Sequence, residues 1–483
     1  MKKSSRRNFL KKTSVFGTGF FIIPRNALGG VGFTSPSDQL NIASIGSGGK
    51  GADIQNPWVS KERVVALCDI DPNGKHGVIQ SRKKYPKANF YIDFNELLEK
   101  EKDLDAVTIS TPDHTHGVIG NRAMNKGLHV YIQKPLTHNI EEARQLTITA
   151  KKNKVVTQMG NQGGSCVGVN KIEEWINSKM IGNISKVFAW TNRPVWPQGF
   201  KMPKPALTTP KDLDWDLWLG PAKYKAYRPE FHPFNWRGWW DYGTGALGDM
   251  GCHLLDVPYK TLSLDYPIDV ECSVATIYEK IWNANYYPEG CPPASIVTLH
   301  FEKNKKTNSN LELTWMDGGI IPPRPEIIPA EDYLGEKGNR NGVFIIGDEG
   351  VITCGVYGLN AKLYRKNKKV EHLNTNLIYN NKNEDGVIAN LDEIHHNQWI
   401  DACKAGYGSK EFHKLTSSFE YAGPFTETVL IGNIALRSYM IKDGKDFIGR
   451  KKLFWDGKNS NIVNFDLANQ FVTRSRRKGW DLK

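Results

Sequence analysis

An acid and an imidazole lie four residues apart in the segment GALGDMGCHLLD, which covers residues 245–256. If this segment is helical, Asp249 and His253 lie one turn apart on the same face. Such a pair, crowded by glycine, alanine and cysteine, fits an active site that needs an oriented proton acceptor and space for a ligand. It also fits a packed helix whose polar pair is satisfied internally. The rest of the sequence has to distinguish the two interpretations.

A glycine-rich segment is the second candidate site. Gly46, Gly48 and Gly51 form the pattern G-x-G-x-x-G directly after the apolar run LNIASIG, which favours a strand, and should open a helix. Glycines at this spacing permit a tight turn and bring backbone amides close to a pyrophosphate. Asp69 ends the next apolar run about twenty residues later, where a carboxylate can accept hydrogen bonds from ribose hydroxyls. This pattern predicts a dinucleotide site in which Asp69 favours NAD and Lys50 keeps NADP open; an ordinary glycine turn, with the acid as a strand-end cap, is the alternative.

Two later strand candidates, DAVTIS and HVYI, end in residues that suit a ligand site. Thr111 and Pro112 follow the first strand, at the carboxyl edge where ligands of doubly wound folds bind. Lys134 follows the second strand, where its amine would lie beside a nicotinamide and stabilise a developing alkoxide; a lysine at a strand end is as often simply solvated. His114 and His116 are two positions apart without a third ligand, so no metal site is predicted.

The residues expected to contact the dinucleotide lie in the glycine turn or at the carboxyl ends of the strand candidates. They are Gly46, Gly48, Gly49, Gly51, Asp69, Thr111, Pro112, His116, Gln133, Lys134 and Asn161. The cofactor expected from this set is NAD, with NADP not excluded.

The stretch FHPFNWRGWWDYG, residues 231–243, combines stacking and hydrogen-bonding groups. Indole faces stack on the apolar faces of pyranose rings, and a guanidinium or carboxylate can bind sugar hydroxyls in paired hydrogen bonds. The segment NRPVWPQ offers an arginine and an indole of the same kind. Tryptophans are nevertheless more often core residues than ligand platforms. The substrate-binding residues expected on these grounds are Arg193, Trp196, Trp236, Arg237, Trp239, Trp240 and Asp241.

The elements that must position these residues fall into two groups. Strand and helix patterns alternate at short spacing over residues 38–162, which predicts a Rossmann-type doubly wound parallel sheet with helices on both faces. Between about residues 265 and 370 the strand candidates follow one another without helices, which predicts an open, mostly antiparallel sheet. We therefore expect an α/β protein with an NAD(P)-binding domain over residues 38–162 and an α+β domain over residues 163–483.

The formal charge of +13 is concentrated at the start of the chain. Residues 1–30 contain seven Lys or Arg and no acid, so removing those seven charges leaves about +6 on the remainder. The remainder has no stripe of basic and aromatic residues, so nucleic-acid binding is not favoured. Arg6 and Arg7, followed by a short apolar stretch that stops at Pro24, indicate a twin-arginine (Tat) export signal over residues 1–30, with a linker over residues 31–37. We expect a periplasmic protein that uses the Tat export machinery, membrane-tethered if the signal is not cleaved; a disordered basic tail is the alternative.

Other features favour structural roles. The seven cysteines are scattered without a C-x-x-C, so neither a disulfide framework nor a zinc knuckle is predicted. His395 and His396 lie in a predicted amphipathic helix, where core or surface positions are favoured over ligand roles. The basic end RSRRKGW is expected to be solvated or to contact another subunit.

Taken together, the motifs resemble those of the glucose–fructose oxidoreductase / inositol dehydrogenase / rhizopine catabolism (Gfo/Idh/MocA) family. The resemblance is carried by GSGGKG, ALCDID, STPDHTH, the QKP triplet and GDMGCHLLD, and runs over nearly all of the mature chain. It implies a dinucleotide-binding domain and a second domain whose open sheet often mediates oligomerisation. It maps the family lysine onto Lys134 and the family's Asp-x-x-x-His pair onto Asp249 and His253. The family triplet is usually Glu-Lys-Pro, so Gln133 removes a charge near the nicotinamide.

The resemblance also implies catalytic roles for three residues. His253 takes the hydroxyl proton while a hydride leaves for the nicotinamide, Asp249 orients the imidazole and stabilises its charged form, and Lys134 steadies the oxygen. Whether His253 or Lys134 is the actual base stays open.

We expect from this an exported NAD(P)-dependent oxidoreductase acting on a secondary hydroxyl of a small-molecule sugar or glycoside, working as a homo-oligomer. Because NAD is not freely available outside the cytoplasm, a tightly held cofactor is expected, and resemblance to exported family members suggests oxidation at C3 of glucosides. An NAD-dependent glycoside hydrolase that acts through transient C3 oxidation and elimination is the alternative. It ranks second, since the family's glycosidase branch carries a different histidine motif in place of GDMGCH. A non-catalytic, cofactor-dependent sugar-binding protein is the third possibility.

Overall fold

The computed structural model describes residues 38–56, 59, 61–74, 76–206, 208–379 and 388–482. The expected export signal and linker, residues 1–30 and 31–37, lie outside the described residues. Within the described ranges, no helix combines the length and the apolar character needed to cross a membrane. Leu40–Lys483 form one compact unit, which contains both sheets.

The first sheet is parallel and has the strand order β3-β2-β1-β4-β5-β6. Its strands are β1 (Asn41–Ile45), β2 (Arg63–Cys68), β3 (Asn89–Tyr91), β4 (Ala106–Ile109), β5 (His129–Ile132) and β6 (Thr157–Met159). β1 and β4 are short apolar runs buried over nearly their whole length, as expected for a parallel sheet covered on both faces. The order reverses between these two strands, so ligands of such folds bind at their carboxyl ends. The predicted doubly wound sheet is confirmed.

Helices pack on this sheet from two parts of the chain. Those between its strands are α2 (Val78–Lys84), α3 (Phe94–Lys100), α4 (Asp113–Asn125) and α5 (Ile140–Asn153), with the short 3-10 helix η3 (Gly49–Gln55) after β1. A further helix, α11 (Ile388–Ala405), returns from the C-terminal part, and its Trp399 and Ile400 share an apolar core with Ile42 and Tyr131 of the parallel sheet. Part of the apolar core of the parallel sheet is therefore supplied by α11, which begins more than 200 residues after the end of the predicted N-terminal domain.

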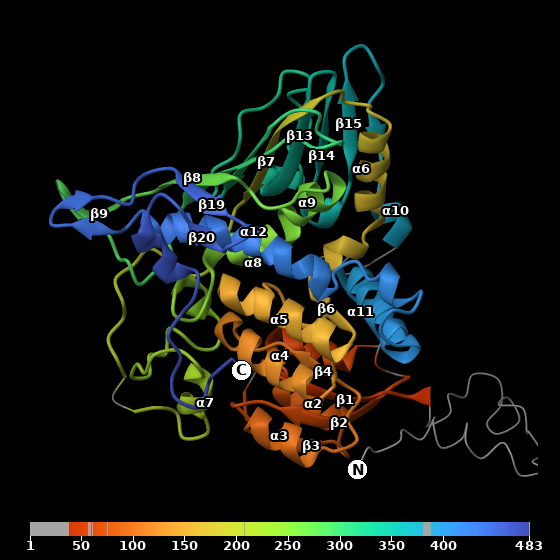
Figure 1. The fold of residues 1–483 in the computed structure, drawn as a ribbon, viewed down its shortest axis with the longest axis vertical. Coiled ribbons are helices and arrows are strands. Elements are labelled where there is room, and N and C mark those ends of the chain that lie inside the picture. The colour runs from red at the N-terminus through yellow and green to blue at the C-terminus, as the bar shows by residue number, and fades with distance from the viewer. Residues whose placement is uncertain are drawn as a thin grey trace, which may run out of the picture. The chain divides into compact units, whose positions relative to one another are not determined.

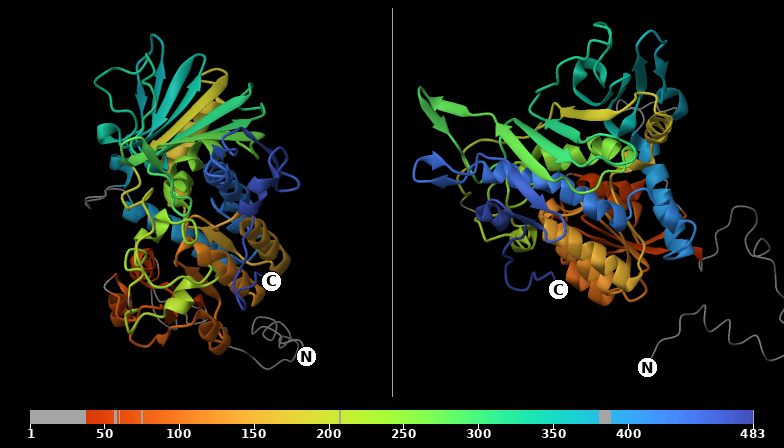
Figure 2. Two further views of the ribbon diagram at one scale, coloured as in Figure 1. Left: turned by 90° about the vertical axis from the view of Figure 1, so that its left-hand side faces the viewer. Right: turned by 45° about the horizontal axis from the view of Figure 1, so that its top comes forward.

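The second sheet has ten strands in the order β16-β15-β14-β13-β7-β12-β11-β8-β19-β20. They are β7 (Ile184–Thr191), β8 (Asp269–Val274), β11 (Ser295–Phe301), β12 (Leu311–Met316), β13 (Asn341–Gly347), β14 (Gly350–Cys354), β15 (Lys362–Arg365), β16 (Glu371–His372), β19 (Leu453–Asp456) and β20 (Asn461–Ile462). Only β7 and β12 pair in parallel, so the predicted open, mostly antiparallel sheet is confirmed. Figure 2 shows its strands fanned across the upper part of the molecule.

The two sheets enclose a layer of helices. These helices are α8 (Gly245–Leu254), α9 (Asp256–Thr261) and α12 (Phe419–Ser438), and they lie between the sheets in Figure 1. α12 contacts α5 on one side and β8 and β11 on the other. The remaining elements are η5 (Gln162–Ser165), α6 (Val167–Asn177), α7 (Trp215–Leu219), η6 (Asn235–Gly238), β9 (Ile277–Lys280), β10 (Asn283–Asn285), η7 (Lys337–Asn339), η8 (Val356–Gly358), α10 (Asn376–Tyr379), η9 (Phe412–Lys414), β17 (Lys442–Asp443), β18 (Asp446–Phe447) and η10 (Asp466–Phe471).

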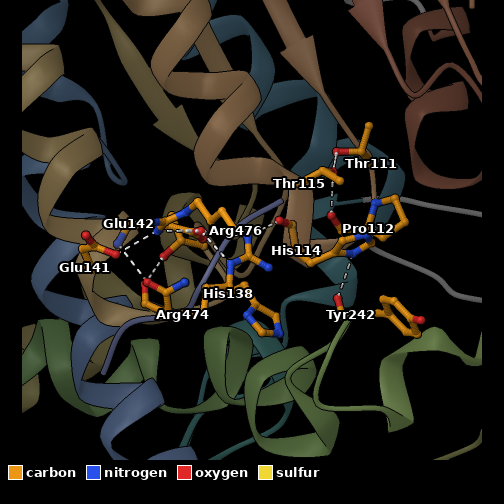
Figure 3. Close-up of polar contacts among 12 residues, drawn as sticks. Thr111, Pro112, His114, Thr115, His138, Glu141, Glu142, Tyr242, Arg474 and Arg476 are labelled. Carbon is orange, nitrogen blue, oxygen red and sulfur yellow. Dashed lines mark hydrogen bonds and ion pairs between the residues drawn. The ribbon is translucent and has the colours of Figure 1, made fainter. Parts of the chain in front are cut away.

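The basic end of the chain docks on the helices of the parallel sheet. Arg474 Nε and Nη2 donate to Glu142 Oε1 at 3.0 and 2.7 Å, and Arg476 Nη2 donates to Glu141 Oε2 at 2.8 Å. Figure 3 shows both guanidinium groups facing these carboxylates at the start of α5. The Glu142 side chain is 0% exposed, so it depends on its arginine partners to offset the loss of hydration. The prediction of a solvated or subunit-contacting end is therefore wrong for Arg474 and Arg476.

Candidate functional site

The glycine turn after β1 has the backbone geometry that its pattern predicts. Gly46 has a φ of +76°, and a Cβ on it would lie 2.9 Å from the carbonyl carbon of Ser110. A Cβ on Gly51 would lie 1.7 Å from the Gly46 oxygen, so both positions require glycine. Gly49 differs: its φ is +52°, and no described atom lies within 4 Å of the position its Cβ would take. The turn opens a 3-10 helix and leaves Gly49 accessible to a ligand.

Asp69 holds this turn in place from the end of β2. Its Oδ2 accepts hydrogen bonds from the amides of Ser47 at 2.9 Å and Gly48 at 3.1 Å. Burial raises the pKa of the Asp69 carboxyl to about 6, although these amides act in the opposite direction. Gly48 also packs closely, since a Cβ on it would lie 2.7 Å from Val78. The expected ribose contact of Asp69 stays a prediction.

The other expected cofactor residues gather at the carboxyl ends of neighbouring strands. Thr111 and Pro112 follow β4, Gln133 follows β5, and Asn161 follows β6. Gln133 and Asn161 are buried, and the Gln133 amide packs against Gly160, where a Cβ would lie 2.7 Å from its Oε1. These residues line one sheet edge together with the glycine turn.

The imidazoles of His114 and His116 contact backbone oxygens of neighbouring loops. The Nε2 of His116 lies 2.7 Å from the Thr111 oxygen and its Nδ1 lies 2.9 Å from the Pro135 oxygen. His114 is held in the same way by the backbone oxygens of Tyr242 and Trp218. Burial lowers the pKa of both imidazoles, that of His114 to about 3. Among the described residues no group of acidic, His or Cys side chains could hold a metal ion. His116 lies between the Thr111 and Pro135 oxygens, and its expected contact with the cofactor stays a prediction.

Lys134 and Asp249 meet at this edge although they lie 115 positions apart. The Lys134 Nζ donates to Asp249 Oδ1 at 2.8 Å and to the Asp249 backbone oxygen at 2.9 Å. The Nε of Arg237 lies 3.5 Å from the same carboxylate oxygen. Burial alone would raise the pKa of Asp249, but the charges of Lys134 and Arg237 hold it well below its ordinary value. The site therefore contains an ionised carboxylate that fixes the lysine amine.

His253 lies one helical turn after Asp249 and is 5% exposed. Burial and the positive charge of Lys134 lower the pKa of His253 well below its ordinary value, against the opposite effect of Asp249. Its Nδ1 is buried and has no hydrogen-bond partner in the described part of the chain. Lys134 contacts the Oδ1 of Asp249, and among the described contacts no hydrogen bond joins Asp249 to this imidazole, so the orienting role expected of Asp249 stays a prediction. His253 is thus a neutral imidazole held by packing.

Tyr357 packs against this imidazole and is not marked by any sequence pattern. Its ring lies 4.8 Å from that of His253 in an edge-on arrangement, and its φ is +65°. A Cβ on Gly163 would lie 2.8 Å from the Tyr357 Cα, so η5 and η8 are in direct backbone contact here. The lone tyrosine between two strands gives no periodic signal, and only the fold brings it to His253.

Asp113 is the second residue that the sequence does not single out. It begins α4 and accepts a hydrogen bond from Thr244 Oγ1 at 2.7 Å. Burial raises the pKa of Asp113 to about 7, although the charges of Arg237 and Lys134 lower it. Its place in STPDHTH, directly after Pro112, is the only signal the sequence contains. Asp113 joins the N-terminal domain to the residue that precedes α8.

The aromatic segment is used mainly for packing. Trp236, Trp239 and Trp240 are each about 5–6% exposed; Trp236 and Trp239 belong to an apolar cluster with Trp215, and Trp240 to the main core. Their expected role as sugar platforms is therefore corrected to a core role. Trp196 is buried as well, with its indole nitrogen bonded to Gln198 at 2.9 Å.

The polar residues predicted beside these indoles separate into two groups. Asp241 forms an ion pair with Lys225 at 2.5 Å, so its carboxylate is occupied outside the Asp249 site. Arg237 lies over the Trp236 ring at 4.3 Å and reaches the Asp249 carboxylate. Arg193, after β7, acts electrostatically on His253. The structure thus brings Arg237 to the Asp249 carboxylate and leaves Asp241 paired with Lys225, and in the described part of the chain no hydrogen bond or ion pair joins Arg193 to Asp249 or His253.

His395 and His396 are core residues, as the sequence favours. His395 is fully buried, with Nε2 2.8 Å from the Met159 oxygen and Nδ1 2.7 Å from the Ser165 hydroxyl. The ring of His396 stacks on Tyr131 at 4.5 Å. Both residues attach α11 to the parallel sheet.

Two family models match consecutive parts of the chain. Residues 40–161 match the oxidoreductase family's NAD-binding Rossmann fold, and residues 166–281 match the same family's C-terminal alpha/beta domain. The expectation of an NAD-binding Rossmann domain is confirmed by the first of these.

A curated relative is the glycosyl hydrolase family 109 protein of Solibacter usitatus, 30% identical over 171 residues. That match covers 31% of this chain and 37% of the relative. An oxidoreductase of Formosa agariphila, P35, is 27% identical over 30% of this chain and 45% of its own length. The chain thus spans less than half the length of these curated relatives.

Solved structures of low sequence identity share the fold. An inositol dehydrogenase homologue of Azotobacter vinelandii, complexed with NADH and myo-inositol, superimposes with a TM-score of 0.52 at 16% identity, over 81% of this chain and 94% of that one. The consecutive matches to both domain models, on the two sheets described above, establish the classification. The chain belongs to the Gfo/Idh/MocA oxidoreductase family.

Proposed function

We propose that this protein is an NAD(P)-dependent oxidoreductase that acts on a secondary hydroxyl of a sugar or glycoside. The observation that carries the proposal is the contact of Lys134 with Asp249, one helical turn from the neutral imidazole of His253, at the edge of the Rossmann sheet. An alcohol dehydrogenase needs a proton acceptor and a cation near the reacting oxygen, and this edge supplies both. A merely packed Asp–His helix would not need a lysine from another domain.

The residues of the chain divide the work of alcohol oxidation. His253 accepts the hydroxyl proton, since its imidazole is uncharged at neutral pH. Lys134 donates a hydrogen bond to the substrate oxygen and stabilises the charge that develops there. Asp249 holds the lysine amine in position through two hydrogen bonds. NAD supplies, when bound, the acceptor for the hydride that leaves carbon.

The glycine turn fits such a dinucleotide. Gly46 and Gly51 allow the backbone to fold closely, and Gly49 leaves space on the outer side of the turn. Asp69 would contact the ribose, and Thr111 and Gln133 would contact the nicotinamide end. We further propose that the cofactor stays bound through the catalytic cycle and that C3 of a glucoside is the carbon oxidised.

Identification of the bound nucleotide and a sugar panel test this function together. Mass spectrometry of the purified protein should find NAD or NADP, and addition of a substrate sugar should produce the absorbance of reduced nicotinamide. Absence of both the nucleotide and a reduced-nicotinamide signal with every sugar would contradict the proposal.

A glycoside hydrolase is the second candidate, favoured by similarity to the family 109 relative from Solibacter usitatus. Transient oxidation at C3 acidifies the C2 proton, which permits elimination of the aglycone, addition of water and re-reduction. Release of free sugar from an aryl glycoside without net change in NAD would support this candidate. Stoichiometric reduction of NAD without cleavage would exclude it.

We also propose that residues 1–30 direct Tat export to the periplasm and that the mature protein forms a homo-oligomer. The twin arginines Arg6 and Arg7 support the first statement, and the open antiparallel sheet supports the second. Cell fractionation of the Arg6→Lys, Arg7→Lys double variant should show loss of the periplasmic protein. Export unchanged by both substitutions would contradict the Tat route.

A further inference from the structure

The buried Nδ1 of the His253 imidazole has no hydrogen-bond partner among the described residues. Asp249, one helical turn earlier, shares its Oδ1 between Lys134 at 2.8 Å and Arg237 at 3.5 Å. In a histidine that moves a proton, the hydrogen bond of one ring nitrogen usually sets the state and orientation of the other. For this imidazole, packing has to set the orientation.

Tyr357 makes a direct ring contact with the imidazole of His253. The two ring centroids lie 4.8 Å apart, and the ring planes meet at 81°. Rings in this edge-to-face arrangement attract each other, because the positive edge of one meets the negative face of the other. His253 is 5% exposed and Tyr357 is 8% exposed, so neither ring has room to turn into solvent. The contact therefore restricts rotation of the imidazole.

The backbone at Tyr357 has an unfavourable conformation. Its φ is +65° within the short element η8, and Gly358 follows with a φ of +77°. The left-handed region is sterically costly for a residue with a Cβ, and above all for a bulky one. Strain of this kind persists where the surrounding structure imposes it, and it is concentrated at functional sites. Here it lies next to the proposed proton acceptor.

Glycines of two other elements hold η8 in this conformation. A Cβ on Gly163, in η5, would lie 2.8 Å from the Tyr357 Cα, and a Cβ on Gly168, in α6, would lie 2.0 Å from the Gly358 oxygen. At the other end of the side chain, the Tyr357 hydroxyl accepts a hydrogen bond from Gln162 Nε2 at 3.4 Å. The tyrosine ring is thus presented from a fixed backbone and is tied at its far end.

A second buried tyrosine of the same domain packs without an unusual backbone. Tyr364 is 1% exposed, lies in the regular strand β15, and belongs to an apolar cluster with Trp190 and Phe344. Burial of a tyrosine in this domain therefore does not by itself call for a left-handed residue. What distinguishes Tyr357 is the place of its ring beside His253.

The hydroxyl of Tyr357 does not compete for the substrate proton. Burial raises the pKa of this tyrosine, so the hydroxyl stays protonated at neutral pH. The ring is therefore the part of the side chain that can influence the reaction, and it does so through the imidazole that it contacts.

We propose that Tyr357 is a positioning residue, which holds the imidazole of His253 in the orientation in which it takes the substrate proton. This rests on the proposed function, since it concerns the proton acceptor of the same reaction. The edge-to-face contact fixes the imidazole, while Asp249 holds the amine of Lys134. Because Tyr357 acts through His253, its removal should change kcat and not substrate binding.

Three substitutions in the cofactor-loaded protein test this role. Tyr357→Met removes the ring and keeps most of the side-chain volume, so kcat for a substrate sugar should fall by a factor of about 10 to 100, with KM changed less than about twofold. Tyr357→Phe keeps the ring without the hydroxyl and should keep kcat within about threefold of wild type. Tyr364→Met removes a buried tyrosine ring elsewhere in the domain and should leave kcat unchanged, which controls for lost stability.

Hydrogen exchange at the imidazole carbon Cε1, followed by peptide mass spectrometry, examines the same contact without turnover. This exchange is faster when water reaches the ring, and its pH profile gives the pKa of that histidine. In wild type, His253 should exchange slowly because its ring is buried. Tyr357→Met should make this exchange at least about tenfold faster and move the pKa of His253 towards 6.5, and Tyr357→Phe should match wild type.

The charges that act on His253 are unchanged in these variants, so a shift of its pKa reports hydration of the ring. These charges belong to Lys134, Asp249, Lys50 and Arg193.

A fourth variant moves the tyrosine without replacing it. Gly163→Ala places a Cβ 2.8 Å from the Tyr357 Cα, so the tyrosine backbone has to shift. This variant should show the same signature as Tyr357→Met, a lower kcat with unchanged KM and faster exchange at His253, at smaller size. If Tyr357→Met does not fold, Gly163→Ala provides the test.

The two measurements keep this inference separate from the proposed function. Unchanged kcat and unchanged exchange in folded Tyr357→Met, or equal losses in Tyr364→Met, would overturn the inference and leave the oxidoreductase function standing. If no sugar reduces the cofactor but His253 still exchanges faster in Tyr357→Met, the function is contradicted and the positioning of the imidazole by Tyr357 is supported.

Discussion

The glycine turn after β1 and the tryptophan-rich segment after β7 are both predicted from sequence to contact ligand, and the structure treats them differently. The turn keeps its expected geometry, with Gly46 and Gly51 pressed against backbone and Gly49 open. In the aromatic segment, Trp239 and Trp240 are buried in apolar cores. The prediction for the turn depends on backbone conformation, which the residue type restricts directly. The prediction for the indoles depends on which way a side chain faces, and packing decides that.

The catalytic group lies between these two cases. Lys134 belongs to the domain of the glycine turn, whereas Asp249 and His253 belong to a helix that follows the aromatic segment. The ion pair between Lys134 Nζ and Asp249 Oδ1, at 2.8 Å, joins the two regions. Substitutions on either side therefore test which region carries chemistry and which carries stability.

The largest effect is expected at Lys134. Lys134→Ala removes the donor to the substrate oxygen and leaves the Asp249 carboxylate without its 2.8 Å partner, so kcat should fall by a factor of about 10³. Steady-state kinetics with a substrate sugar measures this. Lys306→Ala, which breaks a comparable 2.6 Å pair with Glu173 away from the site, serves as the control. A kcat for Lys134→Ala within twofold of wild type would place the lysine outside the reaction.

His253 should show the next largest effect and a characteristic pH profile. His253→Gln should lower kcat by a factor of about 10² to 10³, because it removes the proton acceptor. Burial and the Lys134 charge keep the pKa of His253 well below 6.5, so the wild-type rate should not fall between about pH 8 and pH 6. An inflection in kcat near pH 6.5 would show that a normally titrating histidine controls the rate.

Two glycines of the turn should lose stability to different extents on the same substitution. Gly51→Ala places a Cβ 1.7 Å from the Gly46 oxygen and should lower the free energy of unfolding by about 3 kcal/mol, with loss of bound nucleotide. Gly49→Ala meets open space and should cost only about 1 kcal/mol for its positive φ. Denaturant unfolding and nucleotide content measure the pair. Equal losses at both positions would contradict the assignment of Gly51 to packing and Gly49 to the ligand side.

A smaller effect than that of Gly51→Ala concerns the pH dependence of the stability contributed by Asp113. Because burial raises its pKa to about 7, the folded chain keeps a proton that the unfolded chain loses near pH 3.9. The contribution of protonated Asp113 to the free energy of unfolding is fully present below the unfolded pKa and is lost as the pH rises through about 7. Asn cannot ionise, so Asp113→Asn should gain about 2.6 kcal/mol of unfolding free energy relative to wild type between pH 5 and pH 8. The exposed Asp103→Asn should show no such trend, and a flat difference for Asp113→Asn would contradict the buried assignment.

Much of the fold follows from local pattern. Short apolar runs predict the strands of the parallel sheet, and their alternation with helices predicts its order. What local pattern does not show is the return of α11 to that sheet, because Trp399 and Ile42 are more than 350 residues apart. The docked end of the chain escapes prediction for the same reason, since RSRRKGW has the composition of a solvated tail and Glu142 has no local sign of burial.

Some residues of the candidate site could likewise be predicted from the sequence, and others could not. The family resemblance predicts that Lys134 and His253 belong to the same site, which their spacing in the sequence alone does not predict. Asp249 is found too, but its partner is the lysine and not the imidazole. Tyr357 and Asp113 are missed because their relevance comes from contacts made only in the folded chain.

Isotope transfer tests the central claim most directly. A substrate sugar carrying deuterium on the carbon to be oxidised is mixed with the purified protein, and its nucleotide is analysed by mass spectrometry. Deuterium is expected on the nicotinamide with wild type, and labelling about a thousandfold slower is expected with Lys134→Ala. A sugar that is converted while the nucleotide stays unlabelled would contradict hydride transfer at this site.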